Sequence, residues 1–313
     1  MWRGSRVGVA VPAFRAAASV GDVLRGLPAY VDHVVVVDDG SEDATADAVA
    51  RVAASDPRVV LVRHDRNRGV GGATVTAFRR LLELGAERVV KVDADGQMDP
   101  AQMERLLEPL GDGRHGYAKG NRFHDGAALT AMPKTRLLGN FVLTFLTKAA
   151  SGYWSVADPQ NGYVAVRGDV LARLPLGEIA SRWFFENDML VHLNILRVPV
   201  ADVPMPARYG SERSSLRIPR VLSTFPWLLF RRFWKRVWRR YVLYDSSPIA
   251  LLLLGGVPLC LWGFVFGALT WAKSIRTDVA ATTGTVMLSV LPLVLGFQML
   301  LHALILDIQE TPK

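Results

Sequence analysis

The sequence predicts an α/β domain on a mostly parallel sheet, then basic amphipathic juxtamembrane helices and a C-terminal two-helix transmembrane hairpin. Three observations support this. Apolar, strand-like runs alternate with helix-like stretches in the first half of the chain, which favours parallel strands joined by right-handed crossovers. A stretch rich in arginine and aromatic residues follows, and two charge-free apolar runs come last. We therefore expect three regions, at residues 1–215, 216–247 and 248–313.

The strands of the first region are expected where short apolar runs, most of them rich in valine, occur. Such runs are typical of parallel strands that are buried on both faces. They lie at residues 7–12, 34–37, 59–62 and 88–92, and helices are expected at about 44–54 and 69–84.

The glycines at positions 69, 71 and 72 do not complete a dinucleotide-binding fingerprint, because Thr74 stands where its third Gly or Ala belongs. The sequence also contains no G-x-x-x-x-G-K-[ST] motif. A dehydrogenase or a P-loop enzyme therefore has little support.

Three oxygen-bearing side chains, those of Asp93, Asp95 and Gln97, follow the run at 88–92. Two carboxylates one residue apart, with an amide two residues further on, suit a hard divalent cation such as Mg²⁺ or Mn²⁺, which usually shares such ligands with substrate phosphates. The end of a strand is also where α/β sheets place ligands. The alternative is a solvated turn rich in Asp and Gly.

A second acidic pair, Asp38 and Asp39, ends the run at 34–37 in the same way. Carboxylates there can accept hydrogen bonds from a ligand. The alternative is that they cap the N-terminus of the following helix.

Five motifs in this order resemble the inverting family-2 glycosyltransferases of the GT-A fold. They lie at residues 9–14, 36–41, 67–71, 93–97 and 120–123. Within this family the chain looks most similar to the polyprenyl-phosphate sugar synthases, the subgroup of dolichol-phosphate mannose synthase. Two further motifs, at 158–163 and 185–190, fit that subgroup. The resemblance extends from about residue 7 to 216. It departs from the family at Arg15 and Ala16, where most members carry an Asn-Glu pair whose Glu often helps to hold the nucleotide base.

The resemblance implies a metal-dependent, inverting transfer of a sugar from a UDP- or GDP-sugar to a polyprenyl phosphate. It implies that the divalent metal ion is held by Asp93, Asp95 and Gln97. It also implies the following nucleotide-binding residues: Pro12, Ala13, Phe14, Asp38, Asp39, Asp93 and Ala94. The expected catalytic residues are Asp95, Arg122, Asp158, Glu186 and Asp188. Gln160 is expected beside Asp158 in the donor pocket.

A phosphate acceptor is already ionised near neutral pH, so it needs cations for positioning more than it needs a general base. Arg122 is the best candidate because it lies in a family motif, and the others are Arg136, Arg213 and Ser214. In relatives that glycosylate a hydroxyl group, Glu186 or Asp188 would be the base. With a phosphate acceptor these residues would instead orient the donor sugar.

The last two apolar runs, at 249–272 and 286–306, each reach the ~20 residues that a bilayer-spanning helix needs. Buried helices of a globular domain are the alternative. Residues 273–285 between the runs are too few for anything but a hairpin connection. The single cysteine, Cys260, lies in the first run and excludes an intrachain disulfide.

The excess of positive over negative charge lies just before the first of these runs. Residues 208–240 contain ten Lys and Arg against one Glu, which accounts for the formal net charge of +8. Because aromatic residues are interleaved with these charges, we expect an interfacial helix on anionic lipid rather than a nucleic-acid-binding surface. From the positive-inside rule, and because no signal peptide is recognised at the N-terminus, we expect the catalytic region on the cytosolic side of the cytoplasmic membrane. Homo-oligomerisation is left open.

Two other functions compete with this interpretation. A glycosyltransferase of cell-envelope polysaccharide assembly would use a sugar hydroxyl as acceptor, but the Q-x-x-R-W motif of processive synthases is incomplete, since Ile179 precedes Arg182 and Trp183 where Gln belongs. Two spans are also few for a polymer channel. A non-catalytic membrane scaffold is disfavoured because the metal-ligand motif and Asp158 are intact.

Overall fold

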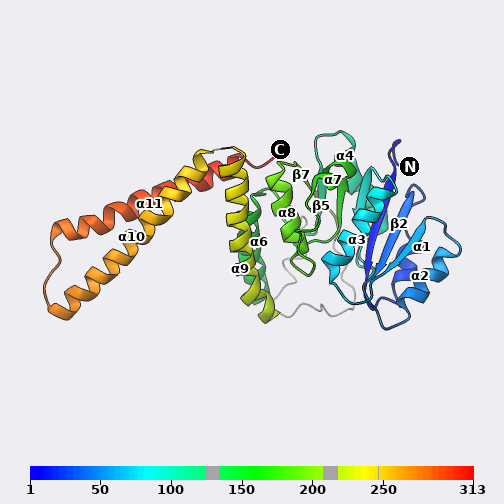
Figure 1. Ribbon diagram of the computed structural model, residues 1–313, viewed down its shortest axis with the longest axis horizontal. Helices are drawn as coiled ribbons and strands as arrows, with labels where there is room; N and C mark the ends of the chain where they lie inside the picture. Colours follow the sequence, from blue (N-terminus) through cyan, green and yellow to red (C-terminus); the bar gives the residue numbers. More distant parts are fainter. Residues whose placement is uncertain (124–133, 207–217, 246) are drawn as a thin grey trace. The chain divides into compact units, whose positions relative to one another are not determined.

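The computed structural model describes residues 1–123, 134–206, 218–245 and 247–313 (Figure 1). These residues separate into two compact units. The first contains residues 1–233 and 312–313, and the second contains residues 234–311.

The first unit is built on a seven-stranded sheet in the order β3-β2-β1-β4-β6-β5-β7. All neighbouring strands pair in parallel except β6, which is antiparallel to both β4 and β5. The strands are β1 Val7–Ala13, β2 His33–Asp38, β3 Val59–Arg63, β4 Arg88–Lys91, β5 Tyr117–Asn121, β6 Val164–Arg167 and β7 Val200–Pro204. The predicted fold class, a mostly parallel α/β sheet, is confirmed.

The four strands expected from the apolar runs are β1 to β4, each within two residues of the expected ends. The two expected helices are α2 (Thr45–Ala53) and α3 (Val70–Glu83). The other helical segments of this unit are α1 Val20–Arg25, η1 Pro100–Gln102, α4 Met103–Gly111, α6 Lys134–Ser151, α7 Gly168–Arg173, α8 Phe185–Ile195 and α9 Ile218–Arg236, of which residues 234–236 belong to the second unit.

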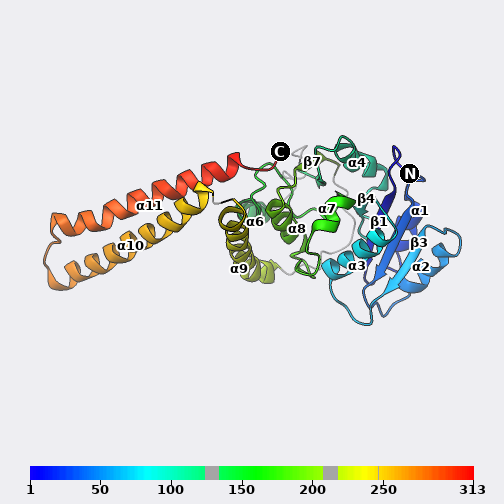
Figure 2. The ribbon, with the colours of Figure 1, turned by 45° about the horizontal axis from the view of Figure 1, so that its top comes forward.

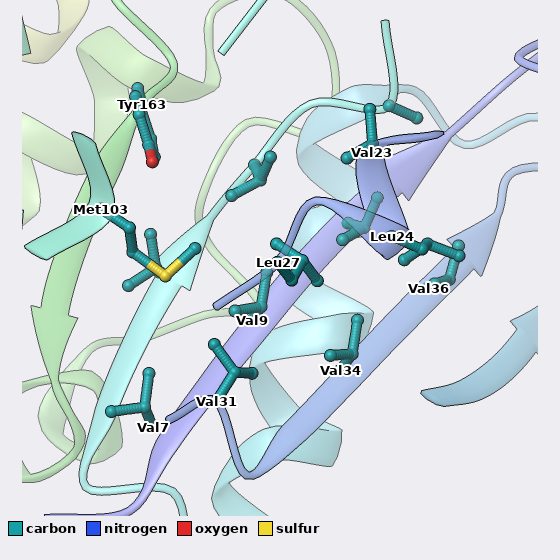
Figure 3. Packing of buried hydrophobic residues seen from close by; sticks show 14 of the residues in the cluster. Val7, Val9, Val23, Leu24, Leu27, Val31, Val34, Val36, Met103 and Tyr163 are labelled. Carbon is teal, nitrogen blue, oxygen red and sulfur yellow. The ribbon is translucent and has the colours of Figure 1, made fainter. Parts of the chain in front are cut away.

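Both faces of the sheet are buried, because successive strand residues point to opposite sides. On one face Val9 and Val36 pack against Leu24 of α1 and Met103 of α4, as Figure 3 shows. On the other face a second cluster joins the strands to α3 and α8; among its members are Ala10, Val35, Phe78 and Met189. This double cover explains why the central strands read as continuous apolar runs.

Helices α6 and α9 form a smaller apolar cluster around Ala150, Phe184 and Leu229. The ring of Phe184 meets that of Phe225 edge to face, with centroids 5.4 Å apart. Large apolar side chains nevertheless remain exposed on both helices, including Phe141 on α6 and Trp227 on α9. Helix α9 occupies the segment expected as a juxtamembrane helix; its place at a membrane stays a prediction.

In the second unit, helices α10 (Pro248–Thr277) and α11 (Thr283–Gln309) run side by side as a hairpin (Figures 1 and 2). Both are long and apolar enough to cross a membrane. Glycines bring their backbones together: a Cβ on Gly296 would lie 2.7 Å from the backbone nitrogen of Cys260, and one on Gly263 would lie 2.7 Å from the carbonyl oxygen of Ser289. Small residues at such crossings are the usual way for apolar helices to associate in lipid.

The segment before the hairpin is tied to the end of α11. It forms a π-helical turn, η2 (Val237–Leu243), and buried Arg236 donates a 2.6 Å hydrogen bond to Asp307. The hydroxyl of Tyr241 donates to the same carboxylate at 2.5 Å. Charged groups this deep are paired, as the cost of burying them requires.

Candidate active site

The predicted metal-ligand motif forms a turn beyond the carboxyl end of β4. Asp93, Asp95 and Gln97 are all partly exposed there. The backbone N–H of Gln97 donates to Asp95 Oδ1 at 3.0 Å, and Gly96 takes a positive φ of 76°. The side chain of Ser19 holds the turn from outside by donating to the carbonyl of Ala94 at 2.7 Å. The carboxylates are therefore presented at the sheet edge by a fixed turn.

A buried lysine that sequence reasoning passed over lies beneath this turn. Lys91 Nζ is 2.6 Å from Asp93 Oδ1, 3.5 Å from Glu186 Oε1 and 3.4 Å from the carbonyl oxygen of Gly162. Burial lowers the pKa of Lys91, but the carboxylates of Asp93 and Glu186 outweigh it, and the net shift is upward. The ammonium group is therefore charged and joins two of the predicted site residues. Its one signal in the sequence is that it interrupts the run of valines at positions 89, 90 and 92.

Arg122 and Asp158, both predicted as catalytic, form a two-point ion pair. Arg122 Nε donates to Asp158 Oδ2 at 2.7 Å, and Nη2 donates to Oδ1 at 3.2 Å. The carboxylate is fully buried, whereas the Arg122 side chain is 37% exposed. The pairing fixes the plane of the guanidinium group while part of it reaches solvent.

Two lysines donate hydrogen bonds to backbone carbonyls of the loop that carries Asp158. Lys119 of β5 is buried and donates to the carbonyl of Asn161, next to the Gly162 carbonyl that Lys91 contacts. Burial lowers the pKa of Lys119 to about 8, against the opposing pull of Glu186 and Asp158. Lys91 and Lys119 both stand opposite Val164, one from each neighbouring strand.

The first turn of α8 separates the two carboxylates predicted at its start. Glu186 reaches Lys91, whereas Asp188 is buried and accepts hydrogen bonds from Arg232 of α9 at 2.7 Å and from the backbone N–H of Ala180 at 2.8 Å. Residues two positions apart on a helix do not share a face, so Glu186 and Asp188 point toward different surroundings.

Between these two carboxylates, Asn187 turns toward the predicted donor-pocket residue. Asn187 Oδ1 accepts hydrogen bonds from Gln160 Nε2 and from Thr147 Oγ1 of α6, each at 3.1 Å. The start of α8 is thus fixed to β4, to α6 and to α9 by three successive residues.

The two residues of the acidic pair at the end of β2, Asp38 and Asp39, also have different partners. Asp39 is buried and fully engaged: its oxygens lie 2.7 Å from His64 Nδ1 and accept from the backbone N–H groups of Arg68 and Gly69 at 2.9 and 2.7 Å. It therefore fixes the loop that leads into α3. Asp38 Oδ1 accepts a hydrogen bond from the backbone N–H of Ser41. Oδ2 is buried without a hydrogen-bond partner among the described residues and lies 3.5 Å from Nε of the exposed Arg63.

The remaining nucleotide-binding predictions lie nearby in the fold. Pro12 and Ala13 end β1, and Phe14 follows them with its ring 44% exposed. Ala94 is buried in the β4 turn. Arg15, which departs from the family pattern, pairs on the surface with Glu42.

Two of the predicted phosphate-binding residues, Arg213 and Ser214, lie outside the described residues. Arg136 falls in helix α6, and its side chain is outside the described part as well. Of that predicted set, the structure describes the side chain of Arg122.

The residues of the β4 turn fit a hard divalent cation. Within the described ranges, no three His, Cys, Asp or Glu side chains gather into a complete metal site. Asp93, Asp95 and Gln97 instead form a partial set of oxygen donors, which suits a cation that takes its other ligands from phosphate and water. Gly162 keeps room beside this set, because a Cβ there would lie 2.9 Å from Asp93 Oδ2.

Comparison with known proteins adds independent findings. A family model described as Glycosyl transferase family 2 matches residues 8–174. A UDP-N-acetylglucosamine–dolichyl-phosphate N-acetylglucosaminyltransferase of Methanococcus voltae is 28% identical over 228 residues, which cover 69% of this chain and 90% of the relative. An undecaprenyl-phosphate mannosyltransferase of Micrococcus luteus is 32% identical over 173 residues, covering 55% and 70%.

Among solved structures, the glucosyl-3-phosphoglycerate synthase of Mycobacterium tuberculosis in complex with Mn²⁺ and UDP-glucose has a TM-score of 0.54 at 22% identity, covering 74% of this chain and 79% of that one. The mannosyl-3-phosphoglycerate synthase of Rubrobacter xylanophilus has a TM-score of 0.57 at 18% identity, covering 75% and 74%. These similarities confirm the expected GT-A fold.

Proposed function

The chain belongs to glycosyl transferase family 2, and we propose that it transfers a sugar from a nucleotide-sugar donor to a polyprenyl phosphate, inverting the anomeric carbon. The observation that carries the proposal is the similarity, over most of the catalytic region, to transferases named for dolichyl-phosphate and undecaprenyl-phosphate substrates. We further propose the regional bounds 1–215, 216–247 and 248–313 for the catalytic, juxtamembrane and membrane-spanning parts.

The donor would bind along the carboxyl edge of β1, β2 and β4. Asp38 Oδ2, which is buried and has no hydrogen-bond partner among the described residues, would accept a hydrogen bond from the base or ribose of a UDP- or GDP-sugar. Asp93, Asp95 and Gln97 would hold Mg²⁺ or Mn²⁺. A divalent ion bound there supplies Lewis-acid neutralisation of the charge that develops on the leaving diphosphate.

The acceptor would bind near Arg122. An oxygen of the lipid phosphate attacks the anomeric carbon while the bond from that carbon to the nucleoside diphosphate breaks. Because the phosphate is already ionised, no proton needs to be removed, and positioning is the main requirement. Arg122, held by Asp158, provides a pre-oriented cation, and Arg136, Arg213 and Ser214 are proposed to complete the phosphate site. Glu186 is proposed to orient the donor sugar.

The test is to incubate the purified full chain with polyprenyl phosphate, Mg²⁺ or Mn²⁺, and a panel of radiolabelled UDP- and GDP-sugars. We expect one donor to give label in the organic phase, dependent on added lipid and released by mild acid. Label that appears only in water-soluble oligosaccharide would instead favour the sugar-hydroxyl acceptor of polysaccharide assembly.

We propose that α10 and α11 cross the cytoplasmic membrane and that the catalytic region faces the cytosol. The support is the length and composition of the two helices and the basic residues of α9 and η2 that precede them, among them Arg231, Lys235 and Arg239.

This orientation predicts which ends of the hairpin are accessible from outside. In a Cys260→Ala background, a cysteine replacing exposed Ala281 between the helices should react with an impermeant thiol reagent in intact cells. A cysteine replacing Lys313 should react only after permeabilisation. The reverse pattern would place the active site away from cytosolic nucleotide sugars and contradict the orientation.

A further inference from the structure

We propose that Lys91 is a positioning residue that holds Asp93 and Glu186 together and weakens binding of a divalent cation at Asp93 until a nucleoside diphosphate is present. The inference rests on the proposed function, because it concerns the metal-ligand turn assigned there.

The ammonium group of Lys91 links two carboxylates of the site. Its Nζ lies 2.6 Å from Asp93 Oδ1 and 3.5 Å from Glu186 Oε1, and these two carboxylates come from the turn after β4 and from α8, 93 residues apart in the chain. Gly162 leaves space for the Lys91–Asp93 ion pair, since a Cβ at that position would lie 2.7 Å from Lys91 Nζ and 2.9 Å from Asp93 Oδ2. The arrangement is therefore built by three separate segments.

Burial decides how Lys91 can act. Its side chain is 0% exposed, whereas that of Asp93 is 28% exposed and that of Glu186 is 13% exposed. The ammonium group cannot touch the donor or the acceptor directly. Any effect on the reaction must pass through the two carboxylates that it holds.

The charges give the direction of the effect. A fixed positive charge 2.6 Å from one oxygen of a metal ligand repels a divalent cation that approaches the same carboxylate. A nucleoside diphosphate brings negative charge that offsets this repulsion. The site would thus favour the cation together with the diphosphate over the cation alone.

Lys119 offers a matched control. It is equally buried and stands opposite the same residue, Val164, but its Nζ bonds to the carbonyl of Asn161 rather than to a carboxylate of the metal-ligand turn. Removing its charge perturbs a buried lysine of the same sheet without removing the cation beside Asp93.

The experiment measures Mn²⁺ affinity by electron paramagnetic resonance, with Mn²⁺ alone and with saturating UDP or GDP. We expect Lys91→Met to bind Mn²⁺ alone about tenfold more tightly than the wild type and to lose most of the enhancement by nucleotide. Lys119→Met should stay within about twofold of the wild type. Should the methionine variant fail to fold, Lys91→Gln, which retains N–H donors without the charge, gives the same measurement.

The outcomes separate this inference from the proposed function. A folded Lys91 variant whose affinity for Mn²⁺ alone is equal to or weaker than that of the wild type overturns the inference. A wild-type protein that binds no Mn²⁺ with either nucleotide and forms no lipid-linked product overturns the proposed function instead.

Discussion

Asp95→Asn is expected to reduce sugar transfer about a thousandfold or more. The neutral amide is a much poorer ligand for a hard divalent cation, and the charge on the leaving diphosphate would lose several kcal/mol of stabilisation. The fold should survive, because Asp95 is partly exposed and an Asn Oδ1 can still accept the hydrogen bond that Gln97 donates. The measurement is the rate of formation of lipid-extractable product at saturating donor.

Two controls accompany this prediction. Asp47→Asn removes an exposed carboxylate from α2, far along the chain from the metal-ligand turn, and should leave the rate unchanged. Excess chelator should inactivate the wild type, and added Mn²⁺ or Mg²⁺ should restore it. Full activity in excess chelator would refute the metal assignment.

Four of the seven strands could be predicted from the sequence, and the reason is burial. The interior positions of β1 to β4 are Val, Ala, Leu, Gly or Pro, and the polar residues of these strands stand at the strand ends. Strands β5 and β7 carry polar residues within short segments, such as Lys119 and Asp202, because both border the site at the sheet edge. Strand β6 has four residues and runs against its neighbours, which the alternation of strand and helix does not indicate.

The composition of the site was easier to predict than its pairings. The motifs named Asp93, Arg122, Asp158 and Glu186, but nothing local showed that Arg122 binds Asp158. Arg122 follows β5 and Asp158 precedes β6, and these two strands pair antiparallel. The role of Lys91 could not be predicted either, because one of its carboxylate partners, Glu186 of α8, is distant in sequence. Long-range contacts of this kind depend on topology, which a single sequence does not encode locally.

Asp188 illustrates the limit of motif transfer. The family resemblance placed it beside Glu186 as a possible base, and the structure places it in contact with Arg232 and the backbone of Ala180. Both donors bind Oδ2, whereas Oδ1 is buried without a hydrogen-bond partner among the described residues and lies 3.4 Å from His192 Nδ1. The side chain of Asp188 is 0% exposed, against 13% for Glu186, so it is the less accessible of the two to a donor sugar. We therefore propose that Glu186, and not Asp188, faces the donor sugar.

Arg122→Ala is expected to slow transfer by one to two orders of magnitude, chiefly through a higher KM for polyprenyl phosphate. Each charge-assisted hydrogen bond to a phosphate contributes about 1.5–3 kcal/mol, and the partly exposed guanidinium group is held in place for such bonds by Asp158. The measurement is initial rate against acceptor concentration at saturating donor.

The Arg122→Ala variant also leaves the buried carboxylate of Asp158 without its cation, which lowers the stability of the fold by itself. This loss of stability must be distinguished from the loss of acceptor binding. The Arg122→Ala, Asp158→Asn double variant removes that unpaired charge and should regain stability without regaining affinity for the acceptor. Arg122→Lys keeps the charge but not the two-point geometry, so its transfer rate should fall between those of the wild type and Arg122→Ala.

The Glu186→Gln variant distinguishes a phosphate acceptor from a hydroxyl acceptor. With a phosphate acceptor it should cost less than Arg122→Ala, whereas a hydroxyl acceptor would make Glu186 the essential base and its loss the more damaging. An indispensable Glu186, a dispensable Arg122 and a water-soluble product would together refute the polyprenyl-phosphate assignment.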